Sequence, residues 1–509
     1  MYSRFLIPVT ERKILEIPYH VLLPTDTLRA RTVRNVSFIG LSQIVVLGLM
    51  LLTAAALARI LTPVDFGIVS IGMVFISLCT TIYDFGVLSA VIQRDTKIEE
   101  SIGVAITLRW IIATISLLIL VSISPFLADF YGQPGLAIVL IVLSTNLFIQ
   151  LISFSSLVLL TRGLKFRQLA ICNVAQYLAI TGVSITLAYE GFSYWSIVYG
   201  SLLGSAVYVL SLRYFENTVV RPSFDRSIAK ELLGFGAHLL VVGLMVFVIF
   251  NVDQLMVGKI LGLAVLGVYY MAVRFGRTLG QQVSGAVNVV LFPTMARIKD
   301  STHSLMIGYT QSLRMISIIA VPLSVGLAAL SPMFVQVVLG DKWSAAAFPI
   351  AVLSIQGLLN AVIAPASNVL IAIGKPHYLS AQATVQAVAL MVGIYPVAVV
   401  YGINGVSVLT TMISLGVFVY FLAVFSRVFK SGVSEIAGPV MSPLASGLVT
   451  FVVLTLASSV LSESGISLFG LAAAGLGTYI ISLHVTSRGR DVREFLDLMR
   501  ASFAKQQGQ

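Results

Sequence analysis

The chain has 509 residues, of which 58% are hydrophobic and only 10% are charged, and its formal net charge is +11. A mean hydropathy of +0.99 excludes a protein whose whole surface faces water. The composition therefore indicates a polytopic membrane protein.

The N-terminal segment does not resemble a targeting signal. Residues 1–27 contain three prolines and no apolar run long enough for the core of a signal peptide. We expect neither cleavage nor a membrane span there, and we assign residues 1–35 to a cytoplasmic N-terminal tail.

Long apolar runs follow this tail. A helix needs roughly 20 apolar residues to span a bilayer, and fourteen runs of that size are bounded by Gly, Pro or charged residues. They predict an all-α fold with fourteen transmembrane helices. The runs cover residues 36–60, 64–92, 103–128, 134–160, 168–189, 193–215, 234–260, 264–292, 306–330, 345–373, 379–400, 404–428, 437–461 and 466–485.

The loops between the runs alternate in charge. With a cytoplasmic N-terminus, the inner loops carry most of the 32 basic residues, whereas the outer loops hold Arg59, Lys259 and Lys342. This pattern follows the positive-inside rule, so we expect both termini in the cytoplasm. The net charge then faces an anionic inner leaflet, and nucleic acid is not an expected partner.

The sequence contains an internal repeat. "RILTPVDFGIVSI" (59–71) matches "KILGLAVLGVYYM" (259–271), Ser124-Pro125 matches Ser331-Pro332, "VLLTRG" (158–163) matches "VLIAIG" (369–374), and Gly191 matches Gly402. The matches occur in chain order and at the same places in the predicted topology. Each half therefore holds six spans of the same orientation, related by an axis along the membrane normal.

The repeat predicts two lobes with additions. These are an N-lobe (36–215), an inter-lobe cytoplasmic loop (216–233), a C-lobe (234–428), two further helices (429–485) and a cytoplasmic amphipathic tail (486–509). Two six-helix bundles that face each other are typical of an alternating-access transporter.

A channel and a membrane enzyme are the rival classes at this level. The chain has no carbonyl-filter motif of a channel. It also has no His/Glu metal pair, nucleophile elbow or Walker A loop, so we expect no enzyme activity, no metal and no cofactor. Cys79 and Cys172 lie in apolar runs and are interpreted as packing residues.

Several short motifs carry a resemblance to a known family. They are "RILTPVDFGIVSI" after the first span, "YDFGVLSAVIQR" at the end of the second, "LTRGLKFRQLA" after the fourth and "IGKPHYLSAQ" after the tenth. With six plus six plus two spans, the chain resembles the polysaccharide-transporter branch of the multidrug/oligosaccharidyl-lipid/polysaccharide exporter superfamily, which includes the exopolysaccharide and O-antigen flippases.

This resemblance implies a function. It implies a flippase in the bacterial cytoplasmic (inner) membrane that moves undecaprenyl-pyrophosphate-linked oligosaccharide from the cytoplasmic to the periplasmic leaflet. The polyprenyl-pyrophosphate-linked oligosaccharide and membrane lipid are then its partners, and a polysaccharide polymerase is a candidate partner. The oligomeric state stays open.

Four arginines within the spans suit such a cargo. Arg274 and Arg277 are predicted roughly 15 and 20 Å into the eighth span, near mid-membrane, and Arg109 and Arg314 lie nearer the inner side. A charge at mid-membrane costs about 2.5 to 3.5 kcal/mol, so these side chains should face a cavity or a partner. Together they predict a ladder of guanidinium groups that binds pyrophosphate.

The same span offers further candidates. Arg274, Arg277 and Gln281 are spaced to share one helix face, and Gly276 and Gly280 form a GxxxG pattern typical of close helix packing. Aromatic residues nearby either stack on sugars or pack in the core: Tyr269, Tyr270 and Phe275. Trp343 is interpreted as part of an interfacial aromatic belt.

Ordinary ion pairs are the competing interpretation. Asp253 lies near the predicted depth of Arg274 and can pair with it, whereas Arg277 has no obvious carboxylate at its depth. Asp84 either pairs with Arg109 or Arg314, or relays a coupling H⁺ or Na⁺. Arg109 and Arg314 can also reach the headgroup region.

Two rival functions remain open within the superfamily. A multidrug or metabolite antiporter is expected to bury an acid in the first helices of a lobe, but the first span contains no carboxylate. A lipid II flippase is the other alternative.

Overall fold

The computed structural model describes residues 26–84, 86–94, 97–285, 302–489 and 491, and these residues form helices and connecting turns without a strand. The predicted all-α fold is confirmed. The segment up to residue 25 and most of the predicted amphipathic tail lie outside the described residues.

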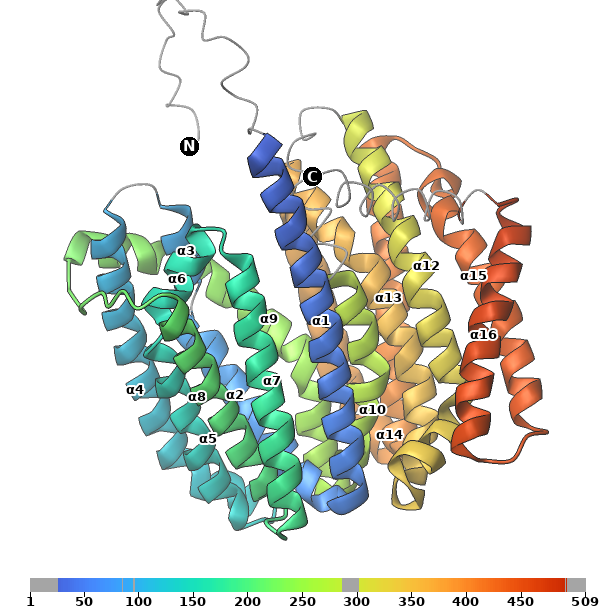
Figure 1. Ribbon diagram of the computed structural model, residues 1–509, viewed down its shortest axis with the longest axis horizontal. Helices are drawn as coiled ribbons and strands as arrows, with labels where there is room; N and C mark the ends of the chain where they lie inside the picture. Colours follow the sequence, from blue (N-terminus) through green and yellow to red (C-terminus); the bar gives the residue numbers. More distant parts are fainter. Residues whose placement is uncertain (1–25, 85, 95–96, 286–301, 490, 492–509) are drawn as a thin grey trace, which may run out of the picture.

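The N-lobe is built from the first eight helices, several of which gather on one side of the molecule (Figure 1). They are α1 (Asp26–Ile60), α2 (Pro63–Asp84), α3 (Val87–Gln93), α4 (Ile98–Phe130), α5 (Gly135–Leu151), α6 (Phe154–Arg162), α7 (Phe166–Tyr189) and α8 (Trp195–Phe215).

The C-lobe and the two added helices lie mostly on the other side (Figure 1). They comprise α9 (Arg226–Leu261), α10 (Leu263–Ala272), the π-helix η2 (Val273–Arg277), α12 (Thr302–Phe334), the π-helix η3 (Val335–Leu339), the 3-10 helix η4 (Asp341–Ala346), α13 (Ala347–Ala372), α14 (His377–Phe429), α15 (Val433–Ser458) and α16 (Gly465–Thr486).

The described residues contain eleven helices that are long and apolar enough to cross a membrane, or twelve if α5 and α6, bent by 49°, form one span. Part of the predicted span 264–292 lies outside the described residues. The count of fourteen spans therefore stays a prediction.

The 53-residue helix α14 contains two of the predicted spans, 379–400 and 404–428. Gly402 interrupts it with φ 59° and ψ −152°, a conformation that favours glycine. The two arms then run back along each other, because the Tyr420 hydroxyl donates to the Tyr378 carbonyl at 3.1 Å. The helix is thus a hairpin that turns at Gly402.

The main hydrophobic core shared by the two lobes lies at one end. One cluster of buried side chains combines residues of both lobes, among them Leu57 and Ile71 from the N-lobe and Leu266 and Trp343 from the C-lobe. Away from this end, one cluster joins α3, α4 and α6 of the N-lobe to the start of α9, and another joins α12 to α16. We call the shared end, formed by residues 58–70, 130–131, 254–271 and 336–343, the contact end.

Glycines of the sequence repeat lie at the centre of the contact end. A Cβ atom on Gly67 would lie 2.0 Å from the Leu263 carbonyl oxygen, and one on Gly267 would lie 1.8 Å from that of Pro63. Both pairs are related by the repeat. Helices α2 and α10 therefore cross in backbone contact at a pseudo-symmetric point that admits no side chain.

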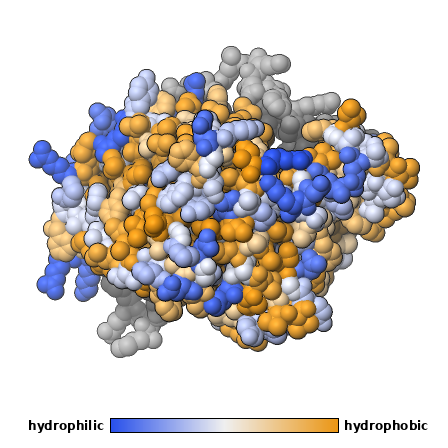
Figure 2. Space-filling model, turned by 90° about the horizontal axis from the view of Figure 1, so that it is seen from below, coloured by the Kyte–Doolittle hydropathy of each residue, from blue (hydrophilic) through white to orange (hydrophobic). Residues whose placement is uncertain are grey.

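Trp343 belongs to this contact and not to an interfacial belt, which corrects the sequence interpretation. Its side chain is fully buried, its indole N–H donates to the Ala58 carbonyl at 2.9 Å, and its ring meets Phe66 edge-on at 5.3 Å. Figure 2 views the molecule from this end and shows hydrophilic patches among the apolar residues.

Candidate functional site

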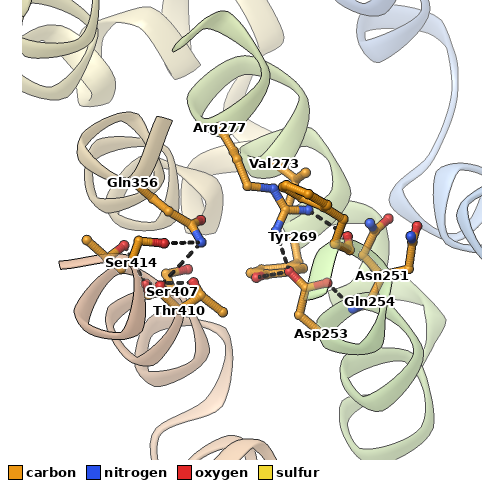
Figure 3. A network of polar contacts seen from close by, with 12 residues as sticks. Asn251, Asp253, Gln254, Tyr269, Val273, Arg277, Gln356, Ser407, Thr410 and Ser414 are labelled. Carbon is orange, nitrogen blue, oxygen red and sulfur yellow. Dashed lines mark hydrogen bonds and ion pairs between the residues drawn. The ribbon is translucent and has the colours of Figure 1, made fainter. Parts of the chain in front are cut away.

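A buried polar cluster in the C-lobe centres on Asp253 of α9 (Figure 3). One carboxylate oxygen accepts hydrogen bonds from the Tyr269 hydroxyl and from Arg277 Nη1, both at 2.9 Å. The other accepts the backbone N–H of Gln254 at 2.9 Å, and Arg277 also donates to the Phe250 carbonyl at 3.0 Å. The buried charge is therefore paired and hydrogen-bonded, as burial requires.

This pairing corrects two expectations. Arg277 has a carboxylate at its own depth, and Asp253 pairs with Arg277 instead of Arg274. The Arg277 and Asp253 side chains are only 5% and 1% exposed, so the ion pair lies inside the C-lobe.

The local backbone explains why Asp253 pairs with Arg277 and not with Arg274. Residues Val273–Arg277 form a π-helix, which inserts an extra residue into the helical turn and rotates the side chains that follow. The expectation that Arg274 and Arg277 share one face assumed a regular α-helix and is wrong here. Arg277 instead points into the lobe, while Arg274 is half-buried.

Arg274 has a different environment. Its Nη1 donates to the Tyr270 hydroxyl at 3.1 Å, and the Tyr270 ring lies 6.4 Å from the ring of Phe66 in the N-lobe. Among the described residues, no carboxylate lies within ion-pair distance of Arg274. Arg274 is thus a partly accessible cation without an acidic partner, close to the boundary between the lobes.

The predicted close-packing face of this span is confirmed. A Cβ atom on Gly280 would lie 2.1 Å from the Gly357 carbonyl oxygen, and one on Gly276 would lie 3.0 Å from that of Ile350. The helix therefore packs directly on the backbone of α13. Gln281, one residue further along, is half-buried.

The aromatic neighbours divide between the two interpretations. Tyr269 and Phe275 are buried in the core at 0% and 3% exposure, so they pack and do not face a sugar. Tyr270 is half-buried beside Arg274.

A second polar group links α13 to α14 beside the Asp253 cluster (Figure 3). Gln356 Nε2 donates to the Thr410 carbonyl and to Ser414 Oγ, both at 3.3 Å. Sequence reasoning missed these residues, because single neutral polar residues at helical spacing carry no distinctive pattern.

Arg109 and Asp84 form an ion pair in the N-lobe. Arg109 Nη1 lies 3.0 Å from Asp84 Oδ1, and the guanidinium lies between the rings of Tyr83 and Phe154, at 4.4 and 4.2 Å from their centroids. The Arg109 side chain is 6% exposed, whereas that of Asp84 is 47% exposed. The carboxylate is thus the accessible member of this pair.

Arg314 lies in the C-lobe beside a residue of the C-terminal segment. Its Nε lies 3.6 Å from Asp491 Oδ1, and Asp491 is 1% exposed. Three of the four predicted arginines therefore pair with carboxylates in their own half of the molecule. The substrate roles of Arg109, Arg277, Arg314 and Gln281 stay predictions.

The sequence is similar to proteins of cell-surface polysaccharide synthesis. Residues 56–348 match the family described as "Polysaccharide biosynthesis protein". The chain is 27% identical over 493 residues to the succinoglycan biosynthesis transport protein ExoT of Rhizobium meliloti, covering 94% of this chain and 97% of ExoT. It is 28% identical over 351 residues to the lipopolysaccharide biosynthesis protein WzxC of Escherichia coli, covering 68% of this chain and 71% of WzxC.

The fold is similar to that of solved membrane transporters. The lipid II flippase MurJ in an inward closed conformation superimposes with a TM-score of 0.70 at 13% identity, covering 88% of this chain and 98% of MurJ. A multidrug resistance transporter of the MATE family, inward-facing, superimposes with a TM-score of 0.54 at 16% identity, covering 77% and 99%. At these identities the likeness concerns the fold alone.

Proposed function

The chain belongs to the polysaccharide biosynthesis protein family, and from this we propose that it is a lipid-linked oligosaccharide flippase. It carries polyprenyl-pyrophosphate-linked glycan units from the cytoplasmic to the periplasmic leaflet of the bacterial inner membrane by alternating access. The names of two relatives support this cargo, because both concern the synthesis or transport of surface polysaccharides.

One structural observation carries the mechanism: the main core shared by the two lobes lies at the contact end, and away from that end the N-lobe packs on α9, the helix that follows the inter-lobe loop. Two bundles joined at one end can rock about that end and expose a central site to either side in turn. With cytoplasmic termini, the contact end faces the periplasm. The conformation described is then closed toward the periplasm.

We propose Arg274 as the main partner of the pyrophosphate group. A guanidinium binds phosphate through two parallel hydrogen bonds, and no acid in the described part of the chain lies within ion-pair distance of this one. Arg277, by contrast, is held by Asp253 and Phe250. The ion pair between Arg277 and Asp253 fixes the position of the π-helix, and Arg274 belongs to the same π-helix.

Coupling to H⁺ or Na⁺ belongs to the same proposal. Asp84 is the more accessible of the two predicted acids, since its side chain is 47% exposed and that of Asp253 is 1% exposed. No reaction chemistry is assigned to the chain, and a polysaccharide polymerase would act after it.

Replacement of Arg274 tests the proposal. Purified protein in liposomes is given a polyprenyl-pyrophosphate-linked oligosaccharide, and its appearance in the opposite leaflet is followed with a glycosidase that does not cross membranes. We expect Arg274→Ala to lower the rate at least tenfold, because a charge-assisted hydrogen bond contributes about 1.5 to 3 kcal/mol. Arg274→Lys should retain part of the rate.

Arg427→Ala is the matched control, since Arg427 is an exposed cation at the end of α14 in the same lobe. It should transport at the wild-type rate. Lipid II and a cationic drug serve as alternative cargoes. Faster transport of either one by the wild-type protein would replace the proposal with the corresponding rival function.

A further inference from the structure

Three basic residues lie in the outer loops, where the charge pattern predicts few basic residues. Arg59, Lys259 and Lys342 are the basic residues assigned to the outer loops, and the positive-inside rule disfavours cations there. All three are exposed, yet each donates hydrogen bonds across the lobe boundary.

Arg59 lies in the last turn of α1 in the N-lobe and reaches the end of η3 in the C-lobe. Its Nε donates to the Val338 carbonyl at 2.9 Å, and its Nη2 donates to the carbonyls of Gln336, at 3.2 Å, and Val337. The last carbonyls of a helix lack partners within the helix and carry its negative dipole end. The guanidinium thus caps a helix of the opposite lobe.

Lys259 makes the equivalent contact in the opposite direction. It lies in the last turn of α9 in the C-lobe, and its Nζ donates to the Phe130 carbonyl at 2.7 Å, at the end of α4 in the N-lobe. The sequence repeat aligns Lys259 with Arg59, and it aligns the end of α4 with the end of α12 and η3 through their Ser-Pro pairs. The two contacts are therefore related by the pseudo-symmetry of the fold.

Lys342 of the C-lobe donates in the opposite direction, to the end of α1, the helix that carries Arg59. Its Nζ donates to the Leu61 carbonyl at 2.7 Å and to the Arg59 carbonyl at 3.1 Å, so it caps the end of α1. Gly340, with φ 100°, makes room for this exchange, because a Cβ atom there would lie 3.0 Å from Arg59 Nη1. Any side chain at this position would also be strained.

From this geometry we propose that Arg59, Lys259 and Lys342 form a latch that holds the contact end closed. The proposal rests on the proposed alternating-access function. Each cation neutralises a helix C-terminus of the other lobe, and these contacts cease when the lobes part. Because the cations are exposed, water can solvate both the cations and the carbonyls on release, so the latch is reversible.

Distance measurements between spin labels test the latch. Glu190→Cys in the N-lobe and Tyr401→Cys at the α14 turn are exposed and related by the repeat, and the buried Cys79 and Cys172 are replaced by Ala. Labelled protein is studied in detergent without cargo by double electron–electron resonance. The ratio of the long-distance to the short-distance population reports opening of the contact end.

The triple variant Arg59→Gln, Lys259→Gln, Lys342→Gln should raise that ratio about tenfold or more, since a cation at a helix C-terminus typically changes an equilibrium two- to fivefold. Lys259→Arg alone should leave it unchanged. The matched control replaces Lys375, Arg427 and Lys430 at the other end of the molecule with Gln, and it should also leave the ratio unchanged.

The outcomes separate this proposal from the function. An unchanged ratio in the triple variant overturns the latch, even if glycan-lipid transport is observed. A raised ratio together with no glycan-lipid transport by the wild-type protein keeps the latch and removes the proposed cargo. If the triple variant does not fold, Lys259→Gln alone, which loses only the exposed contacts with Phe130, decides the question by the same measurement.

Discussion

Asp253 shows what a buried charge requires in a membrane protein. Its carboxylate accepts three hydrogen bonds, from Tyr269, Arg277 and the Gln254 backbone, and none of its charge is left uncompensated. Desolvating two ions costs several kcal/mol each, which their attraction offsets only in good geometry. The pair therefore stabilises one specific arrangement of α9 against η2 more than it adds to overall stability.

Breaking one side of this pair should be costly. We expect Asp253→Ala to destabilise the protein by about 3 to 5 kcal/mol, because it leaves the Arg277 charge buried without a partner. The double variant Asp253→Leu, Arg277→Met should lose less than the single variant. Thermal unfolding in detergent, followed by fluorescence, measures both, and the exposed Asp129→Ala provides the matched control. A double variant less stable than Asp253→Ala contradicts this account.

Sequence reasoning found the charged residues of the site but exchanged their partners. Depth along a helix follows from residue number, so Asp253 and Arg274 were placed at similar depth. The direction of a side chain depends on the local turn, and the π-helix at 273–277 has no composition signal. Arg277 therefore reached the carboxylate that was assigned to Arg274.

At the scale of elements, close helix contacts and sharp turns occur at glycines, because glycine has no side chain. The GxxxG pattern of Gly276 and Gly280 predicted the packing face that meets α13. The α14 turn coincides with the predicted break near Gly402 for the same reason. The sequence did not predict the break within the run 64–92, because the residues on both sides of it are apolar. Gly86 adopts φ 65° at this break, between α2 and α3, and packs against Leu239.

Filling the contact at Gly280 should disrupt the C-lobe. We expect Gly280→Ala to destabilise the protein by about 1 to 3 kcal/mol, because its Cβ would lie 2.1 Å from the Gly357 carbonyl oxygen and the backbones must separate. Gly326→Ala in α12 is the matched control, since a Cβ atom there meets nothing within 4 Å. Thermal unfolding compares the two. Equal unfolding temperatures would mean that the two helices separate without cost.

At the scale of the whole molecule, residues that the sequence repeat aligns also form the interface between the two lobes. Matched residues predicted two lobes of equal orientation, but the pattern could not tell that Gly67 and Gly267 meet the opposite lobe. That information depends on which surfaces pack together, and hydropathy does not distinguish a lobe interface from a lipid-facing side. The same limit placed Trp343 in an aromatic belt when it is buried between the lobes.

The orientation of the molecule decides the direction in which the latch would act. Helix α1 ends at the contact end, whereas the positive-inside rule places the loops rich in basic residues at the opposite end. In intact cells of a strain whose outer membrane is permeabilised, a cysteine at Ser462, in the exposed turn between α15 and α16, should therefore react with a membrane-impermeant maleimide. A cysteine at Lys430, before α15, should react only after the inner membrane is opened. The buried Cys79 and Cys172 give little background. The reverse labelling pattern would place the contact end in the cytoplasm, and the described conformation would then be closed toward the cytoplasm.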